Sequence, residues 1–194
     1  NSTVTGGAVV GITCSNTSPV VNINGNNINS LSSVGAANVN GINITGATLT
    51  NVFKNTIHSL NANGASTGAN GISVSVGTTV NIHNNLIGNL TAPIANAAIP
   101  LNGIQVSGGT ATNVSFNTIY LNASSTGALF GTSGIYLSSS TPNVTLRNNL
   151  VSNTSTPSGT GISAALRRVA TLFTGYNTAS NNNLYDVGTQ SATK

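Results

Sequence analysis

The sequence has 194 residues, of which only 3% are charged, with one acidic side chain and a net charge of +4 at pH 7. Its five basic residues form no patch of the kind that binds nucleic acid, and no apolar run approaches the roughly 18 residues of a membrane span. Because 38% of the residues are hydrophobic, the chain can build a core, and we expect a single domain over residues 1–194.

A glycine–isoleucine pair recurs along the chain at nearly regular spacing. The pairs begin at residues 11, 41, 71, 103, 134 and 161, which gives steps of 30, 30, 32, 31 and 27 residues. A period of this size is typical of solenoids, in which each repeat buries its apolar face against its neighbours. The pairs therefore predict a ladder of core isoleucines, made of Ile12, Ile42, Ile72, Ile104, Ile135 and Ile162.

The first strand of each repeat is predicted to start at this pair. A second core position follows two residues after the isoleucine, at Cys14, Ile44, Val74, Val106, Leu137 and Ala164. The residues between the two positions are polar or amphipathic, and this alternation predicts a strand with one buried and one outward face. Cys14 is accordingly expected in the core as a small hydrophobic side chain rather than as a reactive thiol.

An asparagine follows each glycine of the first five pairs after 14 or 15 residues. Its position locates the second and third strands of the repeat and the turn between them. These asparagines are Asn26, Asn55, Asn85, Asn117 and Asn149. Apolar or β-branched residues come five and three positions before each asparagine and two positions after it, which predicts a second and a third short strand. Glycine, serine and threonine fill the first turn, the asparagine itself is expected to take the left-handed conformation of the second turn, and segments such as residues 90–102 form the third.

Three short strands per repeat predict an all-β fold, a parallel β-helix of about six coils of roughly 30 residues. The stacked asparagines are expected to form a second ladder, in which each side-chain amide bonds the next one along the axis. The last coil, residues 161–194, is irregular, because 22 residues separate Gly161 from Asn183. We expect an insertion within residues 165–176.

The repeat unit resembles a known architecture. The glycine–isoleucine strand, the unit Val-x-Ile-x-x-Asn-x-Ile and the asparagine turn resemble the right-handed parallel β-helix repeats of the pectin-lyase-like superfamily. Residues 148–186, with the sequences ALRR at 165–168 and NNNLY at 181–185, also resemble coils of very large secreted surface proteins of Gram-negative bacteria. Right-handedness and a bacterial extracellular or cell-surface location are what these resemblances imply.

The side chains that catalysis would need are scarce. Polysaccharide hydrolases use two carboxylates and calcium-dependent lyases use several, whereas this chain has Asp186 and no glutamate. His58 and His83 fall at non-equivalent outward positions, and Lys54 and Arg147 are three coils apart. We therefore predict no enzymatic activity, no catalytic residues, no metal site and no cofactor.

Exposed aromatic side chains suggest another function. Carbohydrate-binding proteins stack sugar rings on such side chains, and Tyr136 and Tyr120 are the candidates for glycan contact. Ice binding by threonine rows is a weaker alternative, because Thr50 and Thr112 of the row fall on inward positions.

Our main functional prediction is a structural or adhesive element of an extracellular or cell-surface protein. Residues 11–21 already show the repeat, and the pattern continues to Tyr185, so the ends of the solenoid are expected to contact something else. The expected partners are a second copy stacked head to tail, as in a filament, or further coils of a longer parent chain. The absence of methionine at position 1 suggests a processed product or an excised piece. A carbohydrate-binding or attachment module, which uses the third-turn loops, is the alternative.

Overall fold

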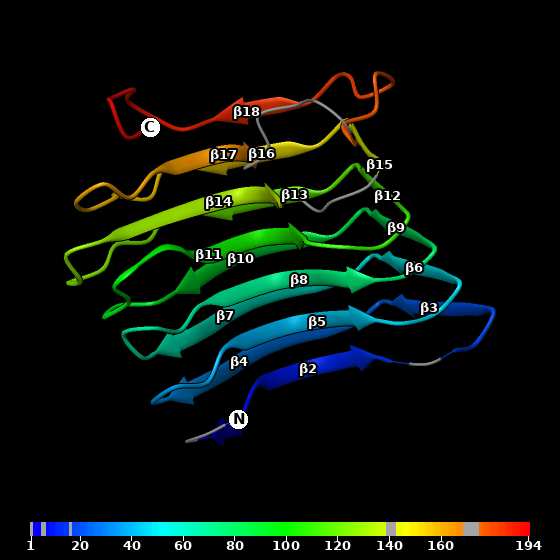
Figure 1. Cartoon of the computed structure of the whole chain (residues 1–194), viewed down its shortest axis with the longest axis horizontal. Coiled ribbons are helices and arrows are strands. Elements are labelled where there is room, and N and C mark those ends of the chain that lie inside the picture. The colour runs from blue at the N-terminus through cyan, green and yellow to red at the C-terminus, as the bar shows by residue number, and fades with distance from the viewer. Residues whose placement is uncertain (1, 5–6, 16, 139–142, 169–174) are drawn as a thin grey trace.

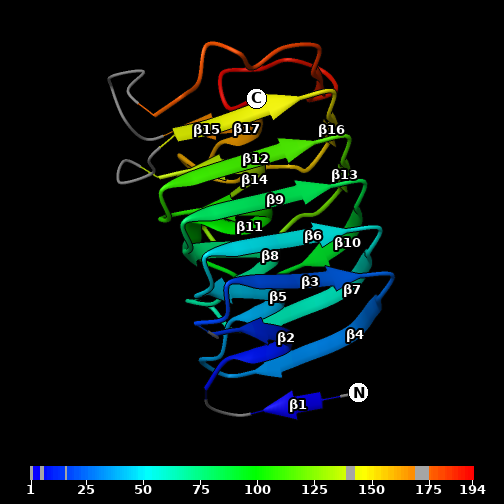
Figure 2. The same cartoon turned by 90° about the vertical axis from the view of Figure 1, so that its right-hand side faces the viewer.

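The computed structural model describes residues 2–4, 7–15, 17–138, 143–168 and 175–194. Within these ranges all regular elements are β-strands, and they form three parallel sheets stacked as a solenoid of about five turns, with about 31 residues per turn. Followed from the N-terminus at the bottom to the C-terminus at the top, the chain rises in a right-handed sense (Figures 1 and 2). The predicted parallel β-helix is confirmed, although the described chain completes about five turns rather than six.

Each of the first five coils contributes one strand to each sheet, in the order sheet B, sheet C and sheet A. Sheet B contains the predicted first strands, β2 (Val9–Cys14), β5 (Val39–Thr45), β8 (Ala69–Val76), β11 (Ala97–Val106), β14 (Phe130–Leu137) and β17 (Ser163–Arg168). Sheet C contains the second strands, β3 (Val20–Asn24), β6 (Leu49–Phe53), β9 (Thr79–His83), β12 (Ala111–Ser115) and β15 (Asn143–Arg147). Sheet A contains the third strands, β4 (Asn27–Val34), β7 (Thr56–Asn63), β10 (Leu86–Thr91), β13 (Thr118–Leu121), β16 (Leu150–Asn153) and β18 (Leu184–Asp186), and it begins with β1 (Ser2–Val4).

The isoleucine ladder forms the centre of the core. Ile42, Ile72, Ile104 and Ile135 pair in register on neighbouring strands of sheet B, and each is fully buried. Burial of each such side chain contributes on the order of 1.5–3 kcal/mol to folding. Ile12 also pairs in register with Ile42, but it is only partly buried because β2 is the edge strand of the sheet. Cys14 lies in the core, as predicted, and is free.

The prediction that Ile162 completes the ladder is wrong. Ile162 is 41% exposed and precedes β17, and the partner of Ile135 is Leu166, four residues further on. The reason lies in the turn before β17, where residues 158–162 pack against β14. The backbone of Ser158 exchanges two hydrogen bonds with Phe130, and a Cβ on Gly161 would collide with the Phe130 carbonyl oxygen. Gly161 is therefore a glycine of the third turn and is not equivalent to Gly134.

The shift by four residues changes the other assignments in the last coil. Arg168, and not Ala164, pairs with Leu137, while Ala164 pairs with Ser133. Of the predicted insertion at residues 165–176, residues 165–168 belong to a regular strand and residues 169–174 lie outside the described part of the chain. Residues 175–181 then follow β15 through isolated bridges at Tyr176 and Asn181.

The predicted asparagine ladder is confirmed and is longer than expected. Each amide Nδ2 donates to the Oδ1 of the next asparagine over distances of 2.8–3.1 Å, through Asn26, Asn55, Asn85, Asn117, Asn149 and finally Asn183. The same Oδ1 atoms also accept the backbone N–H of the preceding asparagine, at 3.1 Å in each case. From Asn55 onward, each Nδ2 also donates to a backbone carbonyl of sheet C, at 2.9 Å. The asparagine amides thus provide hydrogen-bond partners, from inside the solenoid, for backbone groups at the turn between sheets C and A.

The left-handed residue of this turn is not the asparagine, contrary to the prediction. Positive φ angles of 52–69° belong to the residue directly before each one, namely Gly25, Lys54, Asn84, Phe116, Asn148 and Asn182. The ladder asparagine has its side chain directed into the solenoid, where the amide can bond both neighbouring coils. Because the preceding residue forms the outward corner, its backbone takes the left-handed conformation instead.

Candidate functional site

The step of 32 residues from Gly71 to Gly103 is the longest between the glycine–isoleucine pairs, and its extra residues alter the surface of sheet B. The register of β11 against β14 runs from Ala97 opposite Phe130 to Leu101 opposite Thr132, so residues 98–100 bulge out of the ladder. Pro100 lies in this segment and has no N–H to donate to a neighbouring strand. We call residues 98–100 the β11 bulge.

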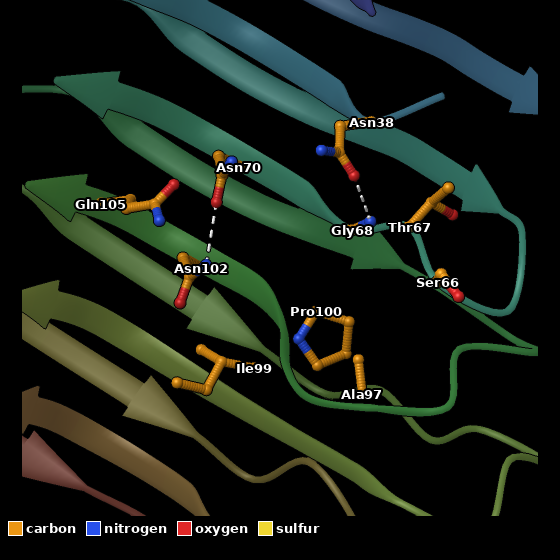
Figure 3. A pocket seen from close by; sticks show the side chains of 10 residues that line it. All are labelled: Asn38, Ser66, Thr67, Gly68, Asn70, Ala97, Ile99, Pro100, Asn102 and Gln105. Carbon is orange, nitrogen blue, oxygen red and sulfur yellow. Dashed lines mark hydrogen bonds between the residues drawn. The ribbon is translucent and has the colours of Figure 1, made fainter. Parts of the chain in front are cut away.

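A polar pocket of about 180 Å³ lies beside the β11 bulge (Figure 3). Its wall combines the turn before β8, the bulge and amide side chains of sheet B, and the lining residues are Asn38, Ser66, Thr67, Gly68, Asn70, Ala97, Ile99, Pro100, Asn102 and Gln105. Gly68 holds two parts of the wall together. Its N–H donates to Asn38 Oδ1 at 2.9 Å, and a Cβ there would collide with the carbonyl oxygen of Pro100. The bulge is thus packed directly on the preceding coil.

Three asparagines form a second, shorter amide ladder along this wall. Asn70 Nδ2 donates to Asn40 Oδ1, and Asn102 Nδ2 donates to Asn70 Oδ1, each at 2.9 Å. The next residue in register is Ser133, whose side chain is too short to continue the ladder. As a result, the Oδ1 of Asn102 is buried and has no hydrogen-bond partner among the described residues, and the same holds for the Oγ of Ser133. Figure 3 shows this Oδ1 on the side of Asn102 that faces Ile99.

The rim of the pocket continues into a row of outward side chains on sheet B. Gln105 pairs with Tyr136, and Tyr136 pairs with Arg167, so the three lie side by side on neighbouring strands about 4.8 Å apart. Arg167 Nη1 donates to the carbonyl oxygen of Ala98 at 3.3 Å and thereby contacts the β11 bulge. Tyr136, predicted as a glycan contact, is half-buried and lies next to the pocket.

Tyr120, the other predicted glycan contact, lies on a different face of the solenoid. It is 48% exposed on β13 of sheet A, and Phe116 is 58% exposed at the turn before that strand. Three exposed leucines accompany them on the outer face of sheet A, at Leu86, Leu150 and Leu184. The structure therefore does not bring Tyr120 and Tyr136 together.

The titratable side chains singled out from the sequence are also dispersed. His83 lies on sheet C, where its ring stacks on Phe53 with centroids 5.0 Å apart, whereas His58 lies on sheet A and bonds Ser59. Arg147 Nε donates to the carbonyl oxygen of Ala179. In the part of the chain that the structure describes, no three His, Cys, Asp or Glu side chains gather in a way that could hold a metal ion.

Asp186 has its own local partners. The N–H of Gly188 and the hydroxyl of Ser152 donate to its carboxylate at 2.9 and 2.8 Å, and these hydrogen bonds lower the pKa of that carboxyl group. The pKa of the neighbouring Tyr185 is raised, chiefly by burial and further by Tyr176.

A second depression follows the first turns of the early coils and has a volume of about 500 Å³. Thr48, Thr78 and Thr110 line it and are exposed, and the backbone bonds of the turn place them in one column. Thr50 and Thr112 are fully buried, as the alternation of the second strand predicts. Among the described residues that line this depression, the exposed threonines are this column and Thr17.

Sequence reasoning located Tyr136 but missed the pocket beside it. The signal in the sequence is the 32-residue step between Gly71 and Gly103 together with the proline at position 100. The chemistry of the pocket is that of neutral hydrogen-bond donors and acceptors around a small apolar wall, which suits binding rather than proton transfer.

Comparison with known proteins gives no match, either to a known protein family, to a curated protein or to a solved structure. The resemblance to pectin-lyase-like repeats and to bacterial surface proteins therefore remains a prediction from the sequence, while the β-solenoid itself is shown by the structure. Among the described residues, no helix is long and apolar enough to cross a membrane.

Proposed function

We propose that this solenoid is a non-catalytic structural or adhesive element of an extracellular or cell-surface protein of a bacterium. The continuous asparagine ladder supports this proposal, because its hydrogen bonds connect all successive coils beside a continuous hydrophobic core. Such a core resists bending and local opening. A chain with one acidic side chain offers little for acid–base catalysis but suits a rigid spacer.

The two ends of the ladder are complementary, and this is the observation that carries the proposal. At Asn26 the Oδ1 accepts no hydrogen bond from the described residues, whereas the equivalent oxygen of every later coil accepts two. At Asn183 the backbone N–H has no partner among the described residues, and Nδ2 donates only to Leu146. A second copy placed head to tail would join these groups and extend the ladder, and further coils of a longer parent chain would do the same.

The C-terminal segment lies at the end of the solenoid where the next copy would stack. Residues 187–194 turn back toward β17, where the Ser163 N–H donates to the Thr193 carbonyl oxygen at 2.9 Å. Head-to-tail stacking therefore replaces this contact with strand pairing to the first coil of the next copy. The segment is also held by Val187, which packs against the core, so the new strand interface must exceed more than the roughly 1 kcal/mol of one hydrogen bond.

Analytical ultracentrifugation tests the stacking. We expect the wild-type sedimentation coefficient to rise with protein concentration, and negative-stain images at high concentration to show filaments. Asn26→Ala removes the terminal acceptor and should shift assembly to higher concentration, whereas Asn29→Ala changes an exposed asparagine of β4, three residues further on, and should not. A wild-type protein that stays monomeric at the highest concentration would rule out assembly by stacking.

We infer a second function, carbohydrate binding, from the position of Tyr136. An aromatic side chain beside a pocket of neutral amides supplies the stacking surface and the hydrogen bonds that sugar rings use. The two functions are compatible, since an adhesive rod needs a ligand. A glycan array probed with the purified protein tests this second function.

A further inference from the structure

We propose that the pocket beside the β11 bulge binds one uncharged sugar residue, with the rest of the glycan passing over Gln105 and Tyr136. This inference rests on the second function proposed above and assigns to it a site and a class of ligand. It is argued from the size of the pocket, its lack of charge, its unpaired acceptor and its rigidity.

The size of the pocket limits the ligand to a single ring. Its volume of about 180 Å³ lies below the roughly 300–1,000 Å³ of sites that enclose drug-sized molecules. This space holds several water molecules and is comparable to a sugar ring that enters by one edge. A longer glycan must therefore leave the pocket, and the row of Gln105, Tyr136 and Arg167 gives it a path along sheet B.

The lining selects against charged ligands. All ten lining residues are uncharged, and the nearest identified cation, Arg167, already donates to the Ala98 carbonyl oxygen. A carboxylate inside the pocket would lose hydration without gaining an ion pair from the lining, whereas a carboxylate further along the row would lie near the Arg167 guanidinium. Sugar hydroxyl groups can donate and accept at once, so they match a wall of amides that offers both kinds of atom.

Asn102 supplies the most specific part of the argument. The residue is only 3% exposed and lines the pocket, and its Oδ1 lacks a hydrogen-bond donor among the described residues. Buried acceptors in folded proteins nearly always have a donor. Since this oxygen is itself covered in the free protein, a ligand hydroxyl reaches it only if the Asn102 amide turns toward the pocket, which would give the buried oxygen a donor.

The pocket is also formed in advance by packing. The close contact of Gly68 with Pro100 fixes one side of the β11 bulge, and the hydrogen bond from Arg167 to Ala98 fixes the other. A preformed site loses little conformational entropy on binding. With about a dozen ligand atoms involved, a dissociation constant in the millimolar range is expected for a single sugar.

Saturation-transfer NMR on the full chain tests the site. The probes are the methyl glycosides of glucose, galactose, mannose and N-acetylglucosamine, together with glucuronic and galacturonic acid. Gln105→Ala removes a half-buried wall residue that belongs to no ladder, and Ser73→Ala makes a matched change at the same register position one coil earlier, outside the pocket. Equal melting temperatures of the three proteins check that each is folded.

We expect at least one neutral glycoside to bind the wild type and Ser73→Ala with equal affinity. The same glycoside should bind Gln105→Ala about tenfold more weakly. Both uronic acids should bind the wild type more weakly than this glycoside. If neither the array nor these sugars bind the wild type, carbohydrate binding itself is wrong. If a sugar binds all three proteins equally, carbohydrate binding stands but this pocket is not the site. If the uronic acids bind as tightly as the neutral glycosides, the proposed selection for uncharged sugars is overturned.

Discussion

The side-chain amide of Asn85 takes part in five hydrogen bonds. Its Oδ1 accepts from the N–H and the Nδ2 of Asn55, and its Nδ2 donates to Asn117 and to the carbonyl oxygens of Val52 and His83. The residue is 2% exposed, so water cannot replace these partners. Because an unsatisfied buried polar group costs about 1–3 kcal/mol, the ladder is a strong constraint on the amino acid at this position.

We predict that Asn85→Ala lowers the free energy of unfolding by about 3 kcal/mol or more, since at least the Asn55 N–H and the Val52 carbonyl lose their partners. Urea denaturation followed by circular dichroism measures the change. The control is Asn113→Ala, which breaks a bond of similar length to Asn81 on the exposed face of sheet C. There water replaces the lost bond, and a change below about 0.5 kcal/mol is expected. Equal decreases in the free energy of unfolding for the two variants would contradict the prediction that a buried ladder asparagine contributes more to stability than an exposed one.

The turn between sheets C and A shows how an element constrains a residue that makes few contacts. Its left-handed corner is occupied by glycine or asparagine in four of six coils, as expected for residues that tolerate positive φ. The exceptions are Lys54 and Phe116, and Phe116 combines a φ of 57° with 58% exposure. A bulky side chain in this conformation costs free energy that its exposed ring does not recover through packing.

We therefore predict that Phe116→Asn raises the free energy of unfolding by about 0.5–1 kcal/mol. The equivalent residues Asn84 and Asn148 already adopt this conformation, so the substitution introduces no new geometry. Thermal melting measures the gain, with Ser115→Asn as the neighbouring control at a residue of β12 without positive φ. An unchanged or lower melting temperature for Phe116→Asn would mean that the ring packs better than its exposure indicates.

At the scale of the whole molecule, the scarcity of charge restricts the ways in which pH can act. Asp186 is the only acidic side chain, and hydrogen bonds from Gly188 and Ser152 lower the pKa of its carboxyl group in the folded state. A carboxyl group with a depressed folded pKa stabilises the protein above its unfolded pKa of about 3.9, and this stabilisation is lost as the pH falls through the folded value. No other acidic side chain is present to add to this loss.

We predict that the free energy of unfolding of the wild type falls below about pH 4 and that Asp186→Asn largely removes this fall. Urea titrations between pH 2 and pH 7 measure both proteins. Because Asp186 is fully exposed, the difference should be small and should shrink with added salt. Parallel acid profiles for the two proteins would show that another group controls the acid response.

The repeat itself was predictable from the sequence because it depends on local patterns. Alternating β-branched residues and an asparagine at nearly constant spacing define the three strands of a coil, the core columns and the amide ladder, and these features are present through the first five coils. Such features repeat every 30 residues or so, and each copy supports the same interpretation of the next. The sequence-based predictions are wrong where one repeat differs from the others. Ile162 is the example, because the preceding Gly161 belongs to the turn that packs against Phe130.

Only the tertiary structure decided which residues of different coils meet. The sequence already places Gln105 and Tyr136 at equivalent outward positions, and the structure pairs them, but only the structure shows that Arg167 rather than Ser163 follows Tyr136 in this row. The pocket likewise requires the contact of Gly68 with Pro100, two residues 32 positions apart in adjacent coils. A strand pattern predicts which side of a sheet a residue faces, because that depends on its own strand alone. Register between coils depends on the length of each turn, and insertions of a few residues alter it without changing the pattern.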